Sequence, residues 1–277
     1  MKREFEFDQR VERSILTTYR KELWKPFILA VKRYELIQEG DRIAVCISGG
    51  KDSMLLAKLM QELQRHSKVH FETAFLVMDP GYNELNRRKI EQNAALLNVP
   101  IQIFETDVFN VANSSEHNPC YLCARMRRGY LYSKAKELGC NKIALGHHFN
   151  DVIETTVMAM FYGAQLQAML PKLHSSNFEG MELIRPLYYV KEKDIKAWAA
   201  YNGLDFIRCA CRFTEHVAAG VTESKSFEIK QLIEQLKQTN ENVEYNIFKS
   251  VYNVNLDTVI GYKENGVRHH FMDDYID

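Results

Sequence analysis

Apolar residues recur along the chain with two spacings, which predicts helices and buried strands in turn. Residues 9–38 have helical spacing, with apolar side chains at Val11, Ile15, Leu23, Phe27, Ile28, Val31, Tyr34 and Leu36. Gly40-Asp41 ends this helix. The stretch 42–47 is apolar and rich in β-branched residues, so it predicts a buried strand, and a helix is expected at 54–63.

The alternation continues to about residue 202. Further strands are expected at 71–78, 101–104 and 142–146, and further helices at 84–97, 121–138, 151–161 and 191–202. We expect a polar loop at 107–119 and short extended segments at 183–187 and 204–208. This pattern predicts an α/β fold with a doubly wound parallel sheet, whose ligands bind beyond the carboxyl ends of the strands.

The pattern also predicts a division into three parts. Residues 1–39 form an N-terminal helical segment, residues 40–221 the α/β domain, and residues 222–277 a C-terminal appendage in which only helices are expected.

Composition and charge exclude some classes of protein. The 277 residues are 46% hydrophobic and 26% charged, an ordinary globular mix. No apolar run is long enough to predict a membrane span, and residues 1–8 lack the apolar core of a signal peptide, so we expect a cytoplasmic protein. The net charge of zero argues against nucleic-acid binding over the whole surface, but it leaves room for a local basic patch.

Two glycines join the first strand to its helix. The string is Ser48-Gly49-Gly50-Lys51-Asp52-Ser53. A Walker loop would need glycine at position 45, which is valine, and a dinucleotide-binding turn would need three spaced glycines. Glycines let backbone N–H groups approach phosphate, and the helix start offers further donors. Lys51 adds a positive charge and Asp52 a carboxylate for Mg²⁺. The string predicts a site for the pyrophosphate of ATP; the alternative is a capped Gly-Gly turn.

Four of the six cysteines form two close pairs. Cys120 and Cys123 open an expected helix, and Cys209 and Cys211 follow the extended segment at 204–208. The spacing is typical of either a four-cysteine zinc site or an iron–sulfur cluster, with a redox pair as a third alternative. The remaining two are Cys46, in a predicted strand, and Cys140, after a helix end. We expect both to be buried structural side chains.

Several motifs occur in order along the chain. The glycine string is followed by Cys120–Tyr132, Lys142–His148, Asp151 with Glu154, Met160–Gly163, Met169–Leu173, Ile184–Leu187 and Glu192–Ile195. Together they resemble the tRNA 2-thiocytidine synthetase-like family of the PP-loop (N-type) ATP pyrophosphatases, over about residues 10–210. The resemblance implies an adenine nucleotide α-hydrolase-like sheet, with residues 40–221 as the PP-loop ATP-binding catalytic domain.

The resemblance also implies site residues. A [4Fe-4S] cluster would be held by Cys120, Cys123 and Cys211, but the family has CxxC where this chain has CxC, so Cys209 stays an alternative third ligand. Lys51, Asp52 and Asp151 are the expected catalytic residues, with Asp151 as Mg²⁺ ligand or proton acceptor. The expected cofactor-binding residues are Ser48, Gly49, Gly50, Lys51, Asp52, Ser53, Met78, Asp79, Arg127, Gly146 and His147.

Three of these residues have ordinary structural alternatives. Asp151 is also a helix-start carboxylate, Asp79 begins an Asp-Pro-Gly turn, and Arg127 lies on a helix face that water could cover.

The activity that the resemblance implies is 2-thiolation of a tRNA cytidine. ATP adenylates the C2 carbonyl oxygen, pyrophosphate leaves, and sulfide delivered through the cluster replaces AMP. ATP, Mg²⁺ and the cluster are the expected cofactors. The expected partners are tRNA and a sulfur donor such as a cysteine desulfurase, with no membrane and a homodimer as one option. The alternatives are a PP-loop enzyme acting on another substrate, such as a free thio-nucleobase, and a non-catalytic ATP- and metal-binding sensor.

Overall fold

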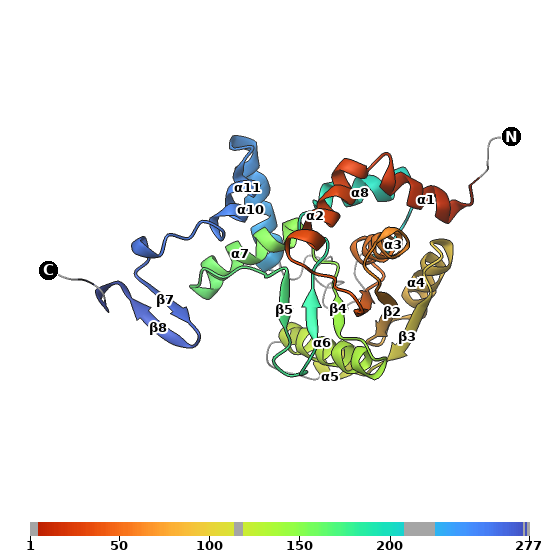
Figure 1. Ribbon diagram of the computed structural model, residues 1–277, viewed down its shortest axis with the longest axis horizontal. Coiled ribbons are helices and arrows are strands. Elements are labelled where there is room, and N and C mark those ends of the chain that lie inside the picture. Colours follow the sequence, from red (N-terminus) through yellow and green to blue (C-terminus); the bar gives the residue numbers. More distant parts are fainter. Residues whose placement is uncertain (1–4, 114–118, 208–224, 274, 276–277) are drawn as a thin grey trace. The chain divides into compact units, whose positions relative to one another are not determined.

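The computed structural model describes residues 5–113, 119–207, 225–273 and 275 (Figure 1). The chain divides into two compact units. The larger unit combines Met1–Val152 with Met169–Ser224, and the smaller unit combines Ile153–Ala168 with Lys225–Asp277. The predicted domain boundaries at residues 39 and 221 stay a prediction.

A six-stranded sheet forms the centre of the larger unit. Its strand order is β3-β2-β1-β4-β6-β5, and every neighbouring pair is parallel except β5 with β6. The strands are β1 (Arg42–Ile47), β2 (Glu72–Asp79), β3 (Ile101–Glu105), β4 (Lys142–Ala144), β5 (Lys172–His174) and β6 (Glu182–Ile184). This order confirms the predicted doubly wound sheet, in which the strand order changes direction between β1 and β4. Ligands of such sheets generally bind at that point, beyond the carboxyl ends of the strands.

Helices cover both faces of this sheet (Figure 1). One layer contains α3 (Lys51–His66) and α8 (Glu192–Tyr201), and the other contains α5 (Val108–Asn113) and α6 (Pro119–Glu137). Buried residues of β1, β2 and β4 pack with Tyr132 and Ala135 of α6. Because residues on both faces of the central strands are buried, those strands are almost entirely apolar, as the sequence predicted. The remaining helices that follow strands are α4 (Glu84–Leu96) and α7 (Phe149–Gly163).

The N-terminal segment is not the single helix expected for residues 9–38. It forms α1 (Phe7–Leu16), a π-helical turn at Arg20–Trp24 and α2 (Lys25–Arg33). The break follows α1, where Thr17 leaves the helical conformation with a φ of −118° and a ψ of −80°. The π-helical turn then continues directly into α2, since Trp24 and Lys25 both have right-handed helical backbone angles. Apolar spacing alone could not locate this break.

A buried ion-pair network holds α1 against α3. Lys58 of α3 is fully buried, and its Nζ donates to Gln61 Oε1 and to the Leu97 carbonyl, both at 2.8 Å. The same Nζ pairs with Glu12 of α1, which also accepts from Arg65 Nη1 at 2.7 Å. The network fixes the helix that carries the glycine loop to the N-terminal segment.

Two further expectations for the larger unit were wrong in detail. The predicted polar loop at 107–119 contains the short helix α5, and residues 204–207 form no strand, while Arg208 lies outside the described residues. The antiparallel edge strand β5 had no distinct sequence pattern, since it is three residues long.

The smaller unit is not wholly helical, which corrects the prediction for the C-terminal appendage. After α10 (Lys225–Thr239) and α11 (Val243–Ser250), β7 (Gly261–Glu264) and β8 (Val267–His270) form an antiparallel hairpin. Asn265 and Gly266 join them with φ angles of 50° and 84°. Asn-Gly is the typical two-residue hairpin turn, so the sequence carried a signal that the helical interpretation missed.

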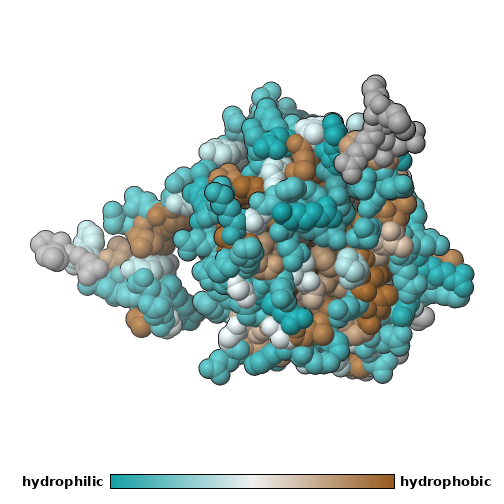
Figure 2. Space-filling view, turned by 45° about the vertical axis from the view of Figure 1, so that its right-hand side comes forward, coloured by the Kyte–Doolittle hydropathy of each residue, from teal (hydrophilic) through white to brown (hydrophobic). Residues whose placement is uncertain are grey.

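On the face of the larger unit that Figure 2 shows, hydrophilic side chains predominate and hydrophobic residues form small patches. No helix in the described ranges is long and apolar enough to cross a membrane.

Candidate functional site

The glycine loop makes a turn that only glycine fits. Gly49 has a φ of +83°, and a Cβ there would lie 2.5 Å from Ile90 Cγ1 and 2.8 Å from Ile207 Cδ1. Ser53 Oγ accepts hydrogen bonds from the Ser48 N–H at 3.1 Å and from Ser48 Oγ at 3.2 Å. It also donates to the Gly50 carbonyl at 3.0 Å, so the two serines brace the turn.

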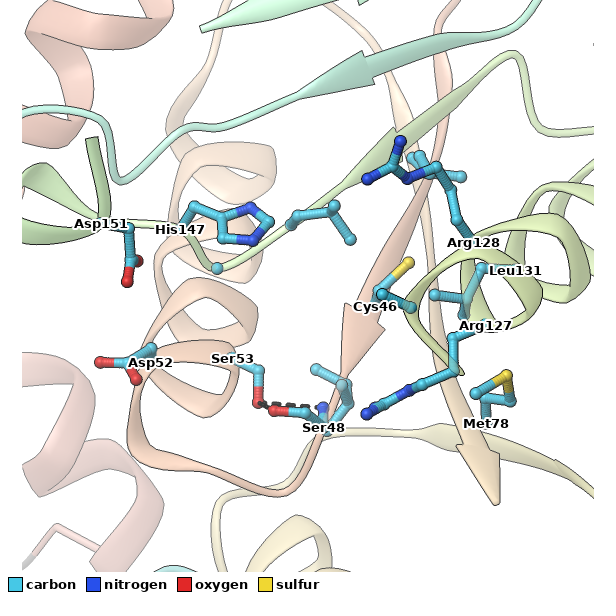
Figure 3. A pocket seen from close by; sticks show the side chains of 15 residues that line it. Cys46, Ser48, Asp52, Ser53, Met78, Arg127, Arg128, Leu131, His147 and Asp151 are labelled. Atoms are coloured by element: carbon cyan, nitrogen blue, oxygen red, sulfur yellow. Dashed lines mark hydrogen bonds between the residues drawn. The ribbon is translucent and has the colours of Figure 1, made fainter. Parts of the chain in front are cut away.

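A cavity of about 440 Å³ opens beside this loop, at the carboxyl ends of β1, β2 and β4 (Figure 3). The expected site residues that line it are Ser48, Asp52, Ser53, Met78, Arg127, Gly146, His147 and Asp151. The structure therefore brings together residues that are separated by up to about a hundred positions in the sequence.

Gly146 allows the loop after β4 to lie against the start of α3. A Cβ at Gly146 would lie 3.1 Å from the Ser53 backbone nitrogen and 3.2 Å from the Asp52 carbonyl carbon. Backbone atoms cannot give way as a flexible side chain can. This contact sets the spacing between Asp52 and the residues that follow β4.

Two carboxylates and a histidine form the acidic side of the cavity. His148 is buried, with Nε2 3.7 Å from Asp52 Oδ1 and Nδ1 3.3 Å from Asp151 Oδ2. The His148 N–H donates to Asp151 Oδ2 at 2.8 Å. Asp52 Oδ1 is buried and has no hydrogen-bond partner within the described part of the chain.

An unsatisfied buried carboxylate oxygen fits a cation site. Mg²⁺ is usually held by one or two carboxylates together with phosphate oxygens, so Asp52 and Asp151 suit Mg²⁺ bound with ATP. No group of three or more metal-ligating side chains is found within residues 5–113, 119–207 and 225–273. Phosphate oxygens of the nucleotide would therefore supply further Mg²⁺ ligands besides these two carboxylates.

Arginines form the opposite side of the cavity. Arg127 and Arg128 of α6 line it, and Arg185, which follows β6, is buried beside it. Burial and repulsion from Arg128 lower the pKa of Arg185 to about 10. Sequence reasoning placed Arg185 in a motif but gave it no role, because its position beside the cavity depends on the pairing of β4 with β6.

Arg185 also determines the proton position on His147. Burial and the Arg185 charge lower the pKa of His147 to about 4, so the ring is neutral near pH 7. The Arg185 Nε donates to His147 Nδ1 at 3.3 Å, and a guanidinium can only donate. The ring proton must then lie on Nε2, which makes His147 a hydrogen-bond donor through that atom.

Lys51 lies on the other side of the loop. Its Nζ is 3.0 Å from Asp52 Oδ2 and 3.1 Å from Glu192 Oε1. Burial alone would lower the pKa of Lys51, but these two carboxylates raise it above its usual value. Gly50 and Lys51 line a second hollow, of about 530 Å³, between the loop and α8. Glu192 is a neighbour of Lys51 that the sequence did not reveal.

The Asp79 side chain is used by its own turn. Its Oδ1 accepts from the Gly81 and Tyr82 N–H groups at 2.9 and 2.7 Å, and its Oδ2 pairs with Arg87 Nη1 at 3.0 Å. These contacts favour the structural alternative for Asp79. Met78, one residue earlier, does line the cavity.

Two of the four paired cysteines lie within the described part of the chain. Cys120 and Cys123 lie in the first turns of α6, while Cys209 and Cys211 lie outside the described residues. Cys123 is one helical turn from Arg127, which lines the cavity, so the CxxC pair lies on a helix that forms the cavity wall. The role of Cys120, Cys123 and Cys211 as cluster ligands stays a prediction.

Cys46 and Cys140 are buried structural residues, as expected. Burial raises the pKa of the Cys46 thiol to about 12, so it stays protonated although it borders the cavity.

Comparison with known proteins agrees with this geometry. Residues 11–211 match the PP-loop domain family. The tRNA-cytidine(32) 2-sulfurtransferase of Syntrophotalea carbinolica is 36% identical over 228 residues, which cover 81% of this chain and 86% of that protein. The chain belongs to the PP-loop family that includes these sulfurtransferases. The same name describes a protein of Alkalilimnicola ehrlichii, 36% identical over 81% of this chain and 70% of its own length.

A solved structure supports the PP-loop fold. The U34-tRNA thiolase NcsA from Methanococcus maripaludis, determined with its [4Fe-4S] cluster, superposes with a TM-score of 0.65 over 82% of this chain and 76% of its own. At 19% identity this likeness establishes the fold alone. The predicted family and fold class are confirmed, and with them the prediction of a PP-loop ATP pyrophosphatase-type enzyme.

Proposed function

We propose that this PP-loop protein is an ATP-dependent tRNA sulfurtransferase that converts a cytidine of tRNA to 2-thiocytidine. The observation that carries the proposal is the cavity itself. It is bounded by the glycine loop, by a buried carboxylate oxygen that lacks a partner among the described residues, and by the helix that begins with Cys120 and Cys123. Curated relatives with 36% identity are named for this reaction.

The loop would bind ATP through its triphosphate. Gly50 is the N-cap residue of α3 and makes no side-chain cap bond, so the first N–H groups of the helix can bind phosphate oxygens. Lys51 neutralises negative charge on the leaving pyrophosphate, for which it must exchange part of its contact with Glu192 for phosphate. Asp52 and Asp151 would hold Mg²⁺, which would supply further positive charge for the phosphates.

The chemistry then needs two bond exchanges. The cytidine C2 carbonyl oxygen attacks the α-phosphorus, and the bond to pyrophosphate breaks. Sulfide attacks C2, and AMP leaves with the former carbonyl oxygen. A [4Fe-4S] cluster held by Cys120, Cys123 and Cys211 would supply the sulfide when bound. His147 Nε2–H and Arg127 lie on the cavity wall as donors for the negative charge that forms on the α-phosphate.

The sulfur donor, such as a cysteine desulfurase, the possible homodimer and the choice between Cys209 and Cys211 stay predictions from the sequence.

Pyrophosphate release tests the proposal. Anaerobically purified protein with MgATP should release pyrophosphate when unmodified tRNA is added. Asp52→Asn should reduce this release by about a hundredfold or more, while Asp257→Asn, at an exposed aspartate of the smaller unit, should not change it. Release that depends on a free thiolated base instead of tRNA would favour the alternative substrate. ATP binding with no release under any condition would favour the sensor.

A further inference from the structure

The N-terminal segment is unusually basic for a neutral protein. Residues 7–33 contain seven lysines and arginines and three acidic residues, whereas the rest of the chain has 29 basic and 33 acidic residues. The segment therefore has a net charge of +4 and the remainder a net charge of −4. Concentrated positive charge on one surface is the electrostatic feature expected of a nucleic-acid contact.

Six of the seven cations are exposed and have no acidic partner among the described residues. They are Arg10, Arg13, Arg20, Lys21, Lys25 and Lys32. One acidic residue of the segment, Glu12, is instead buried and paired with Lys58 and Arg65 of α3. The folded segment thus presents six positive charges outward, and none of the six forms an ion pair with a carboxylate in the described ranges.

A hollow of about 450 Å³ lies within this surface. Arg10, Arg13, Thr17 and Thr18 line it together with Tyr201, the last residue of α8. Tyr201 is 61% exposed, and its ring lies edge-to-face against the Tyr19 ring, with 5.6 Å between the ring centroids. Guanidinium groups bind phosphate and an exposed aromatic ring stacks on an unpaired base, so the hollow offers the two contacts that single-stranded RNA uses.

Helix α8 connects this surface to the catalytic loop. Its first residue, Glu192, contacts Lys51, and its last residue, Tyr201, borders the hollow. At 1.5 Å per residue, these ends are separated by about 14 Å. One folded RNA can span that distance.

We propose that residues 7–33 and Tyr201 form a docking surface for the phosphate backbone of tRNA, separate from the cavity that takes the reacting base. This inference rests on the proposed function, because RNA is favoured over other polyanions by the proposed substrate. A basic helical surface could also bind anionic lipid, and the experiment distinguishes the two.

The test replaces four exposed cations with glutamine, as Arg10→Gln, Arg13→Gln, Arg20→Gln and Lys21→Gln in one protein. Four exposed cations elsewhere, at Lys68, Lys136, Lys263 and Arg268, are replaced in the same way as a matched control. Both variants lose the same net charge. Thermal melting should show that both remain folded, because none of the substituted side chains is buried.

Binding of unmodified tRNA is measured over a range of salt concentrations. Each lost phosphate contact reduces the magnitude of the slope of log K against log salt concentration by about 0.7 to 0.9. For the N-terminal variant this slope should therefore be smaller in magnitude by about 3. The tRNA KM should rise about tenfold or more, while ATP binding stays unchanged. The control variant should keep a slope near that of the unchanged protein.

Equal losses in the two variants, or an unchanged slope in the N-terminal variant, would overturn the proposal. Binding to phosphatidylserine vesicles without binding to tRNA would also overturn it. Thiolation with an unchanged tRNA KM in the N-terminal variant would refute the surface but leave the proposed function standing. RNA binding that depends on these residues, without thiolation by the unchanged protein, would refute the function but keep the surface.

Discussion

The Gly49→Ala substitution tests the geometry of the catalytic loop. At a φ of +83°, an alanine is strained by about 1 kcal/mol relative to glycine. Its Cβ would also lie 2.5 Å from Ile90 Cγ1, and overpacking of this kind costs about 2 kcal/mol. The expected loss in unfolding free energy is therefore about 3 kcal/mol, which lowers the melting temperature of a unit of this size by roughly 9 °C.

The assay is thermal unfolding combined with MgATP binding. Gly129→Ala is the matched control, because Gly129 lies inside α6 with open space around it, and alanine should stabilise that helix by about 0.5 to 1 kcal/mol. Gly49→Ala should also weaken ATP binding, since the loop must shift to relieve the contact. If Gly49→Ala melted within about 2 °C of the unchanged protein and bound ATP normally, the account of the loop would be wrong.

Three further predictions follow from the site and its support. Asp52→Asn should reduce Mg²⁺-dependent pyrophosphate release by about a hundredfold or more, because the amide is a poor Mg²⁺ ligand. Nucleotide binding measured without Mg²⁺ is the check, and it should stay unchanged. Because the pKa of His147 is about 4 in the folded chain, the unfolded chain binds a proton that the folded chain does not as pH falls from 6.5 to 4. The unfolding free energy should therefore fall by about 3 kcal/mol over that range, and His147→Gln should flatten this pH dependence in urea titrations. Lys58→Met should cost about 3 kcal/mol in the same titrations, because it removes the fully buried partner of Glu12, and a loss below about 1 kcal/mol would show that Arg65 alone satisfies that carboxylate.

The sheet and the glycine loop could be predicted from sequence because each has a local physical cause. Residues 43–47 are buried on both faces, so they had to be continuously apolar, and the strand, which begins at the exposed Arg42, has the predicted bounds of 42–47. The loop was predictable because Gly49 satisfies a backbone requirement within six residues. Burial and backbone geometry of this kind leave a direct signature in the sequence.

The contacts that complete the site had no such signature. Arg185 meets His147 across 38 positions, and Glu192 meets Lys51 across more than a hundred. Both pairs depend on which elements become neighbours in the sheet and its covering layer. His148 was not separable from His147 by sequence, because only the fold buries one between two carboxylates and sets the other against an arginine.

The central claim is most directly tested by mass spectrometry of the nucleosides in tRNA from cells with and without this protein. The account predicts that 2-thiocytidine is lost without the protein and returns with the unchanged chain, but not with Asp52→Asn. Unchanged 2-thiocytidine in cells that lack the protein would contradict it.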